Sequence, residues 1–385
     1  MLTIFLMAAL AADTAPAVTV HRQPALPVVA LRMALLADDP QGFAGAGHLI
    51  QHLHLPAMEE QAARVGARVQ ALRTSDALVY TVTGPAAELD YLAGVLRGAL
   101  RAPNPAQPQL LMALNALAEE RGSERETAAS YVRAALRQGV FPGELPAAGT
   151  AASARRLETA PLEALWGEMY APERLAVVAV GDVGAEQVAR ALSGLPGAAG
   201  ERLAEAAPDT APSLAVDTPQ ATRAWSGWAA TAPADDAASL SVAARLVGNR
   251  LRRGMTGSTV EVEHWWTHRG HALAIVAASP GPRAAAARRT VAGAVAATLD
   301  ALDAAAVADA VAGVRRDLLF YSRTPERMAE VLGAFADRGG EPDAAQRFFA
   351  ALDGVTEASV RAVLEGVRAS EPVTVAIAPQ RLVPN

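Results

Sequence analysis

The apolar positions of this chain follow two periods, which predict short strands alternating with longer helices. Alternating or continuous apolar runs are typical of strands, and apolar residues every three to four positions are typical of helices. The predicted strands cover residues 18–20, 28–35, 69–82, 175–180, 224–230, 258–263, 271–278 and 373–378. The predicted helices cover residues 86–100, 109–138, 237–252 and 283–302. The first two strands are short and close in sequence, so they are expected to pair as a hairpin.

The same order of elements occurs twice, which predicts a duplicated α+β fold. At 385 residues the chain is too long for one typical domain. We therefore expect two homologous domains, at residues 17–200 and 223–385, each a mainly antiparallel sheet packed with helices. Residues 201–222 are rich in Ala, Pro and Asp without clear periodicity, and they are the predicted linker.

The amino terminus has the character of an export signal. Residues 1–12 are largely apolar, and Ala9-Leu10-Ala11 fits a small-residue cleavage site, so residues 1–16 are a predicted signal peptide. The alternatives are a misplaced start codon or a buried first strand, because the run lacks a basic residue. Export would place the protein in the periplasm. No later segment has 18 uninterrupted apolar residues, so no membrane span is expected.

Composition narrows the possible chemistry. The net charge is −6, and all 34 basic residues are Arg, scattered rather than clustered into the basic stripe typical of nucleic-acid binding. The chain has no Cys, which excludes disulfides, thiolate metal sites and a Cys nucleophile. Any metal site must therefore use His and carboxylate ligands.

The sequence His48-Leu49-Ile50-Gln51-His52 is the strongest candidate for such a site. On a helix, His48 and His52 are one turn apart and project from one face, so both imidazoles can bind one metal ion. In the inverted zinc-peptidase motif H-x-x-E-H, the residue before the second His is a Glu that acts as general base. Gln51 has a neutral amide there, which cannot accept a proton at neutral pH. Taken alone, two histidines in an apolar helix are also consistent with an ordinary core pair.

Several separated stretches resemble, in order and spacing, the insulinase/pitrilysin family of zinc metallopeptidases, the inverzincins. The resemblance extends over nearly the whole length of the chain. The stretches that carry it are Gly45-Ala46-Gly47-His48-Leu49-Ile50-Gln51-His52; Gln70-Ala71 with Asp76 and Tyr80; Gly149-Thr150; and Tyr170-Ala171-Pro172-Glu173-Arg174-Leu175 with Val180-Gly181-Asp182-Val183. The resemblance implies a two-domain half-size peptidase scaffold with a degenerate H-x-x-Q-H motif.

The resemblance also implies further site residues. The third zinc ligand of the family is a Glu on a later helix, where Glu119 and Glu120 both stand, and counting back from Phe141 favours Glu120. The alternative is that both are solvated helix carboxylates. In the family, an edge strand beside the zinc helix binds substrate peptides, and Gln70 and Ala71 are the corresponding positions here.

Three departures from the family affect catalysis. Gln51 removes a general base whose contribution is about 10²- to 10⁴-fold. The segment after Phe141 reads Pro-Gly-Glu-Leu-Pro instead of His-Pro-Tyr-Gly. The family also places an Arg and, seven residues later, a Tyr near the oxyanion. Arg252 or Arg253 supplies the Arg, but the positions seven residues later are Thr259 and Val260.

The remaining histidines have simpler interpretations. His54 is off the face shared by His48 and His52 and is expected to be structural. His264, His268 and His271 form a second histidine-rich stretch, predicted to be a polar hairpin around Gly270 rather than a metal site.

Three functional hypotheses follow. The first is a catalytically impaired homologue that binds extended peptides as a non-catalytic or regulatory subunit, paired with a homologous active subunit or as a homodimer, with zinc as a possible cofactor. The second is an active zinc-dependent endopeptidase that uses a substitute carboxylate such as Glu59, Glu60 or Glu119. The third is a non-enzymatic envelope protein that binds peptides or assists assembly.

Overall fold

The computed structural model describes residues 17–171, 174–194, 221–233, 236–339 and 343–379. The predicted signal peptide, residues 1–16, and residues 201–220 of the predicted linker lie outside the described residues. The chain forms two compact units. Unit 1 contains the described residues of 1–121, 145–207 and 318–345, and unit 2 contains those of 122–144, 208–317 and 346–385.

Unit 1 is built on a five-stranded sheet with the order β1-β5-β2-β4-β3. Its strands are β1 (Ala17–Arg22), β2 (Val28–Leu35), β3 (Arg68–Arg73), β4 (Leu78–Pro85) and β5 (Leu175–Gly181). All pairs are antiparallel except β1 with β5. Every residue of β5 is buried, as its continuous apolar run predicts.

Two predictions about these strands are wrong. The first two strands do not form a hairpin, because β5 lies between them. The connection over residues 23–27 is long enough to cross the width of one strand, about 10 Å. The predicted single strand 69–82 is a hairpin, and its turn is closed by Thr74, whose hydroxyl accepts from the N–H groups of Asp76 and Ala77.

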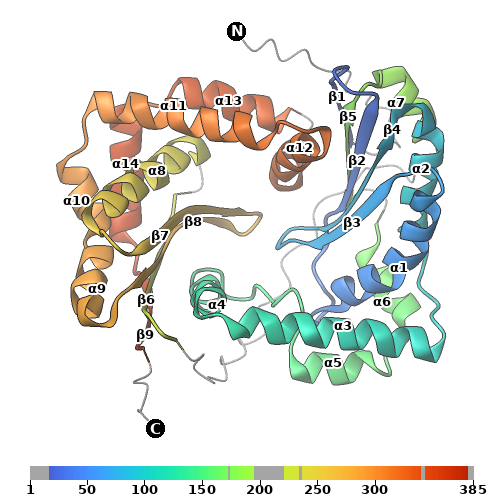
Figure 1. The fold of residues 1–385 in the computed structure, drawn as a ribbon, viewed down its shortest axis with the longest axis horizontal. Helices are drawn as coiled ribbons and strands as arrows, with labels where there is room; N and C mark the ends of the chain where they lie inside the picture. The colour runs from blue at the N-terminus through green and yellow to red at the C-terminus, as the bar shows by residue number, and fades with distance from the viewer. Residues whose placement is uncertain (1–16, 172–173, 195–220, 234–235, 340–342, 380–385) are drawn as a thin grey trace. The chain divides into compact units, whose positions relative to one another are not determined.

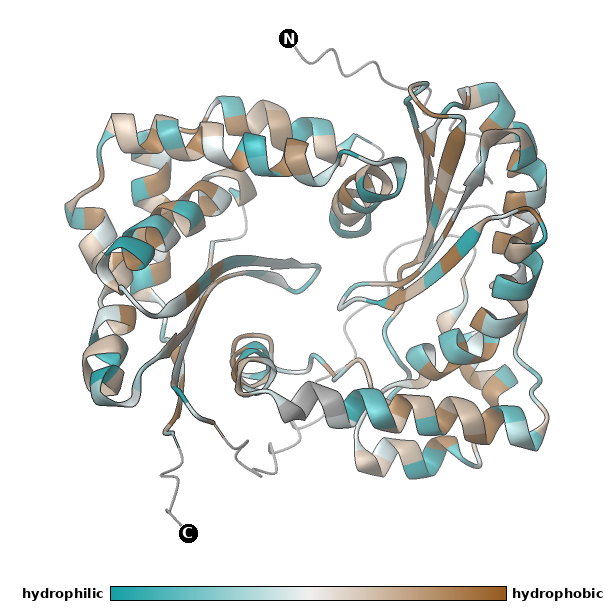
Figure 2. Ribbon diagram, viewed as in Figure 1, coloured by the Kyte–Doolittle hydropathy of each residue, from teal (hydrophilic) through white to brown (hydrophobic). Residues whose placement is uncertain are grey.

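Helices cover both faces of the unit 1 sheet. On one face, α1 (Ala46–Ala63) and α2 (Leu89–Gly98) bury alternate residues of the strands, including Leu31 and Met33 of β2. On the other face, α12 (Pro325–Gly339) packs on Ala30, Val178 and Val180. Figure 2 shows the resulting pattern, with apolar positions concentrated on the strands and alternating with polar ones along the helices.

Unit 2 is built on a four-stranded antiparallel sheet with the order β7-β8-β6-β9. Its strands are β6 (Ala224–Ala232), β7 (Thr259–Thr267), β8 (Gly270–Ser279) and β9 (Val373–Ile377). Helix α4 (Ala128–Val140) packs on one face through Val132 and Leu136. Gly227 of β6 permits this approach, because a Cβ there would lie 2.4 Å from a methyl of Val132.

The other face of the unit 2 sheet is covered by α8 (Ala237–Gly254), α9 (Ala284–Ala292) and α14 (Glu357–Ala369). The described residues also form η1 (Ala86–Glu88), α3 (Gln107–Glu126), α5 (Ala151–Leu157), α6 (Leu162–Met169), α7 (Ala185–Ala191), η3 (Gly281–Arg283), α10 (Ala294–Asp300), α11 (Ala304–Tyr321) and α13 (Ala344–Asp353). The predicted long helix 109–138 is thus two helices, separated at Thr127, whose hydroxyl caps α4 by accepting from the Ser130 N–H.

The duplicated α+β fold class is confirmed. The series β2-α1-β3-β4-α2 with β5 recurs as β6-α8-β7-β8-α9 with β9, and both sets have the same neighbour order within their sheets. The compact units do not coincide with the predicted domains, residues 17–200 and 223–385, because one segment from each range belongs to the other unit. Unit 2 contains α4, and unit 1 contains α12. Within the described residues, no helix has the length and apolar character needed to span a membrane.

Candidate metal and peptide site

Helix α1 begins at a turn that only glycine can make. Gly45 precedes the helix with a φ of 86°, and a Cβ on it would lie 3.0 Å from the backbone of Gly149. Asp39 accepts hydrogen bonds from the N–H groups of Gly45, at 2.7 Å, and Gly47, at 2.9 Å. Its side chain is only 4% exposed and is 3.9 Å from Arg73. This buried carboxylate fixes the start of α1, two residues before His48.

The two histidines of α1 and Glu120 of α3 lie together in unit 1. The imidazole rings of His48 and His52 are stacked, with their centroids 4.8 Å apart. Nε2 of His48 is 3.0 Å from one carboxylate oxygen of Glu120, and Nε2 of His52 is 3.4 Å from the other. Among the described residues, these three form the one group whose donor atoms could hold a metal ion together.

The residues present fit a divalent metal ion such as zinc. Two nitrogens and a carboxylate are a common donor set for catalytic zinc, and ligands about 2.1 Å from one ion at tetrahedral angles are roughly 3.4 Å apart. The three ligand atoms of this group all lie within 4.8 Å of one another. Nε2 of His52 is buried and makes no hydrogen bond in spite of its proximity to Glu120. The ligand roles of His48, His52 and Glu120 remain predictions.

The electrostatics of His48 favour a neutral imidazole. Burial lowers the pKa of His48 below its ordinary value, the Glu120 carboxylate opposes this effect, and the neighbouring His52 adds to it. A neutral ring leaves a nitrogen lone pair available, which is the form that binds a metal.

Gln51 is held away from any role as a base. Its side chain is buried, and its amide nitrogen donates to the carbonyls of Leu72, at 3.1 Å, and Val79, at 3.0 Å. These residues face each other across the β3–β4 hairpin, so Gln51 ties α1 to both strands. Both partners are carbonyls, which fixes the nitrogen as the donor. The side-chain oxygen is buried without a hydrogen-bond partner.

The predicted peptide-binding residues Gln70 and Ala71 lie on β3, which is an edge strand of the unit 1 sheet. Helix α1, which carries His48, packs against this strand. Nearby, the apolar side chain of Leu72 is 53% exposed. An open edge beside the candidate metal site could receive an extended peptide by strand addition.

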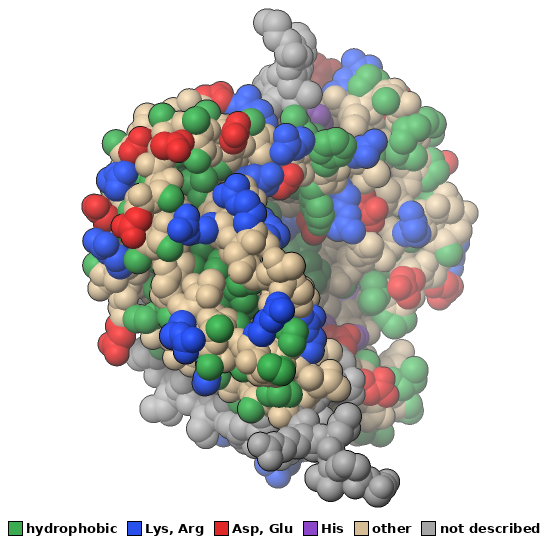
Figure 3. Space-filling model, turned by 60° about the vertical axis from the view of Figure 1, so that its left-hand side comes forward, with side chains coloured by type: hydrophobic (Ala, Val, Ile, Leu, Met, Phe, Trp, Pro, Cys, Tyr) green, Lys and Arg blue, Asp and Glu red, His purple; other side chains and the backbone are tan. Residues whose placement is uncertain are grey.

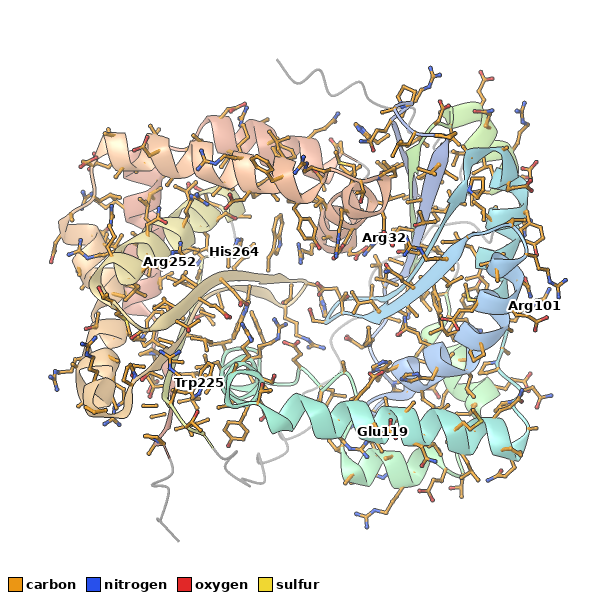
Figure 4. The ribbon with its side chains drawn as sticks, in the orientation of Figure 1. Arg32, Arg101, Glu119, Trp225, Arg252 and His264 are labelled. Atoms are coloured by element: carbon orange, nitrogen blue, oxygen red, sulfur yellow. The ribbon has the colours of Figure 1, made fainter. Side chains whose placement is uncertain are left out.

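The alternative carboxylates are not placed at the histidines. Glu119 is exposed on α3 (Figure 4), and only Glu120 belongs to the metal group. Glu59 and Glu60 are exposed on α1, and Glu60 is paired with Arg64. Within the described residues, none of these three carboxylates joins the group of His48 and His52.

Arg252, the predicted oxyanion contact, belongs to unit 2, near the end of α8 (Figure 4). Its guanidinium donates to the side chain of Asn249 at 3.1 Å and is exposed. Thr259 begins β7, where its hydroxyl accepts from Arg223, and Val260 is buried. A phenol hydroxyl is absent from both positions.

His54 and two histidines of the second histidine-rich stretch contact other groups of the protein. His54 is buried between the Tyr80 hydroxyl, at 3.1 Å, and the Arg101 carbonyl, at 2.9 Å. His264 of β7 and His271 of β8 are diagonal neighbours across the hairpin, since His264 pairs with Leu273 and His271 with Trp266, and their ring nitrogens are 2.8 Å apart. That short distance is typical of a hydrogen bond between the rings.

Asp39 and Arg73 are site-supporting residues that sequence reasoning missed. Asp39 is close to His48 in sequence and raises its pKa against the effect of burial. The only local signal is an acidic residue ahead of a Gly-rich helix start, which is a capping arrangement. Arg73 gives no local signal, because its proximity to Asp39 depends on how β3 packs on the start of α1.

No protein-family model matches the chain, and no curated protein sequence matches it. The fold, however, is similar to solved structures. It is similar to a peptidase M16 inactive domain from Pseudomonas fluorescens, with a TM-score of 0.77, 16% identity, and coverage of 95% of this chain and 96% of that one. It is similar to a protease from Helicobacter pylori, with a TM-score of 0.77, 14% identity, and coverage of 95% and 98%.

A third similar structure is an M16-like peptidase from Alicyclobacillus acidocaldarius, with a TM-score of 0.73, 18% identity, and coverage of 95% and 96%. At these identities the likeness shows the fold alone. The chain therefore has the α+β fold of M16, insulinase-like peptidase structures over 95% of its length.

Proposed function

We propose that this chain is an insulinase/pitrilysin-type peptidase homologue that has lost its general base and binds extended peptides as a non-catalytic or regulatory subunit. The observation that carries the proposal is the position of Gln51. Its amide nitrogen donates hydrogen bonds to two strand carbonyls. Among the described residues, Glu120 is the one carboxylate grouped with the two histidines. One of the similar structures is itself described as an inactive domain.

Zinc is the proposed metal, held by His48, His52 and Glu120. When bound in such a site, zinc polarises a carbonyl or a water molecule. The residues of this chain would supply the ligands and their orientation, with Asp39 fixing the start of α1. They supply no general base, since Gln51 cannot take up a proton.

Peptide binding is proposed at the open edge of β3. Strand addition depends on backbone hydrogen bonds and therefore does not require catalysis. The proposed partner is a homologous active subunit or a second copy of this chain, as in the dimers that the resemblance implies. An active endopeptidase with Glu59, Glu60 or Glu119 as substitute base has weaker support, because these carboxylates are exposed and outside the metal group.

The test separates cleavage from binding. The purified chain is incubated with a mixture of unstructured peptides, with and without a zinc chelator, and the products are identified by mass spectrometry. No chelator-sensitive cleavage is expected, whereas labelled peptides should bind in fluorescence anisotropy. Robust chelator-sensitive turnover by the chain alone would contradict the loss of catalysis.

The binding strand is tested with two proline variants. Successive residues of an antiparallel edge strand direct their N–H groups alternately to the partner strand and outward. Of Gln70→Pro and Ala71→Pro, one should therefore block peptide binding while keeping the melting temperature, and the other should lower the melting temperature. If neither variant that remains folded weakens binding, the edge strand is not the peptide site.

A further inference from the structure

Three arginines of unit 2 line one open groove. Arg253 stands in the last turn of α8, Arg250 stands just before that turn, and Arg289 stands near the end of α9. The groove has a volume of about 660 Å³, and its walls include the small residues Thr290 and Gly293. Figure 3 brings the α8 and α9 side of the molecule forward and shows basic groups at its surface.

The described part of the chain does not neutralise the charge of these arginines. Within the described part of the chain, none of the three guanidinium groups has a hydrogen bond or an ion pair. The segments that line the groove, residues 250–254 and 289–297, contain no Asp or Glu. This accumulation of positive charge occurs in a chain whose net charge is −6.

Helix dipoles explain only part of this arrangement. Basic residues in the last turn of a helix are stabilised by the partial negative charge at that end, by about 0.3–1 kcal/mol each. That effect accounts for Arg on each helix, but it does not require three guanidinium groups around the same groove. Like charges that line one groove repel one another, and an anion placed between them relieves the repulsion.

We propose that this groove binds an acidic peptide segment in an extended conformation. Arg forms paired hydrogen bonds with carboxylates, which suits recognition of Asp and Glu side chains. Arg250 and Arg253 are three residues apart on α8, a spacing that places their Cβ atoms about 5–6 Å apart on one helix face. Alternate side chains of an extended chain are about 6.6 Å apart on one side, so carboxylates at every second position match this pair.

The open form of the groove favours a peptide over a small anion. A volume of about 660 Å³ exceeds what a single phosphate fills, and the lining includes Leu251 and two alanines beside the arginines. Among the described residues, no aromatic side chain lines the groove, so they offer no stacking surface for a nucleobase. This proposal does not depend on zinc or on the role of Gln51.

The test is a titration of the full chain with fluorescein-labelled peptides, followed by anisotropy. The first peptide has Glu at every second position between glycines, the second has Gln at the same positions, and the third has the same Glu content in one block. We expect binding of the first, about tenfold weaker binding of the third, and no binding of the second beyond what the β3 edge gives to any extended peptide. Equal binding of the first and third peptides would contradict the proposal that the arginines recognise carboxylates at every second position of an extended peptide.

The variants locate the site. Arg250→Gln, Arg253→Gln and Arg289→Gln should each weaken binding of the alternating peptide about tenfold, as the loss of a charge-assisted hydrogen bond predicts. Arg288→Gln is the matched control, because it removes the same charge from an exposed neighbour that does not line the groove. If Arg288→Gln weakens peptide binding as much as the groove variants do, the binding reflects general charge attraction and the proposal is wrong.

Inorganic tripolyphosphate separates the two kinds of anion. If it binds through the three arginines while the acidic peptides do not bind, the groove is a phosphate site and the proposal is wrong. All four substituted side chains are exposed, so the variants should keep the wild-type melting temperature. Loss of peptide binding in a variant with unchanged melting temperature would support the proposal.

Discussion

The side-chain amide of Gln51 donates to the carbonyl of Val79 at 3.0 Å, in the interior between α1 and β4. The same nitrogen donates to the carbonyl of Leu72 across the hairpin. A carboxylate at this position would face two carbonyl oxygens and could satisfy neither when ionised. The residue that appears in sequence to be a missing base is therefore a hydrogen-bond donor on which local packing depends.

The first prediction concerns Gln51→Glu. The variant should lose about 3 kcal/mol of unfolding free energy at neutral pH, because it removes two buried hydrogen bonds and buries a charge. It should not gain chelator-sensitive peptidase activity. Chemical denaturation and a peptide-cleavage assay are the measurements, with Gln51→Met as the uncharged control. Unchanged stability together with rapid cleavage would contradict this interpretation of Gln51.

The pH dependence of that variant gives a second prediction. Burial beside carbonyl oxygens raises the pKa of a carboxyl group, so the folded variant binds its proton more tightly than the unfolded chain. Stability is then highest at low pH and falls as the pH rises through the raised pKa. The difference from wild type should be smaller at about pH 5 than at about pH 8. A difference that is constant with pH would indicate that the carboxylate has reached solvent.

Local periodicity explains why the fold class was predictable. The buried strand β5 and the apolar faces of α2 and α8 each follow from the spacing of apolar residues within one short segment of the sequence. The pairing of β1 with β5 is not local, because it joins residues about 160 positions apart in sequence, as in Ala17 with Ala176. Likewise, the apolar stripes of α4 and α12 show that each helix is buried, but not which sheet it covers.

The site was predictable to a similar extent. The spacing of His48 and His52 places both rings on one helix face, and the resemblance indicated Glu120 as the residue beside them. The partners of Gln51 could not be predicted, because they are backbone carbonyls 21 and 28 residues away. Strand carbonyls have no sequence signature, so only the packing of α1 on the hairpin reveals the contact.

The third prediction concerns the metal. His48→Ala, His52→Ala and Glu120→Gln should each abolish stoichiometric zinc binding, because each removes one of three donor groups. Glu119→Gln is the matched control on the same helix and should retain zinc, since Glu119 lies outside the group. Elemental mass spectrometry of the purified proteins and competition with a zinc indicator give the result. Zinc binding that survives loss of both histidines would place the metal elsewhere.

The fourth prediction concerns Asp39, which accepts from the N–H groups of Gly45 and Gly47. Asp39→Ala should weaken zinc binding about 10- to 100-fold, the usual effect of removing a group that orients metal ligands. Asp39→Asn keeps one acceptor oxygen and should lie between wild type and Asp39→Ala. Amide hydrogen exchange at the start of α1 should increase in the same order. Unaltered zinc affinity with faster exchange would show that the turn and the ligands are independent.

The fifth prediction concerns the buried ion pair between Arg32 of β2 and Asp337 of α12, which links the exchanged helix to the unit 1 sheet. The two side chains are 4% and 5% exposed, and one of their two hydrogen bonds is 2.9 Å long. The Arg side chain occupies space above Gly333, where a Cβ would lie 2.3 Å from the guanidinium. Removing one partner leaves a buried charge without compensation.

Arg32→Met and Asp337→Leu should therefore each lower the unfolding free energy by about 3–5 kcal/mol, and the double variant should recover most of that loss. Chemical denaturation of the two single variants and the double variant, arranged as a double-mutant cycle, measures the coupling. Additive losses would show that the pair contributes no specific energy. Recovery in the double variant would show that the penalty comes from the unpaired charge, so that packing rather than the ion pair holds α12 on its sheet.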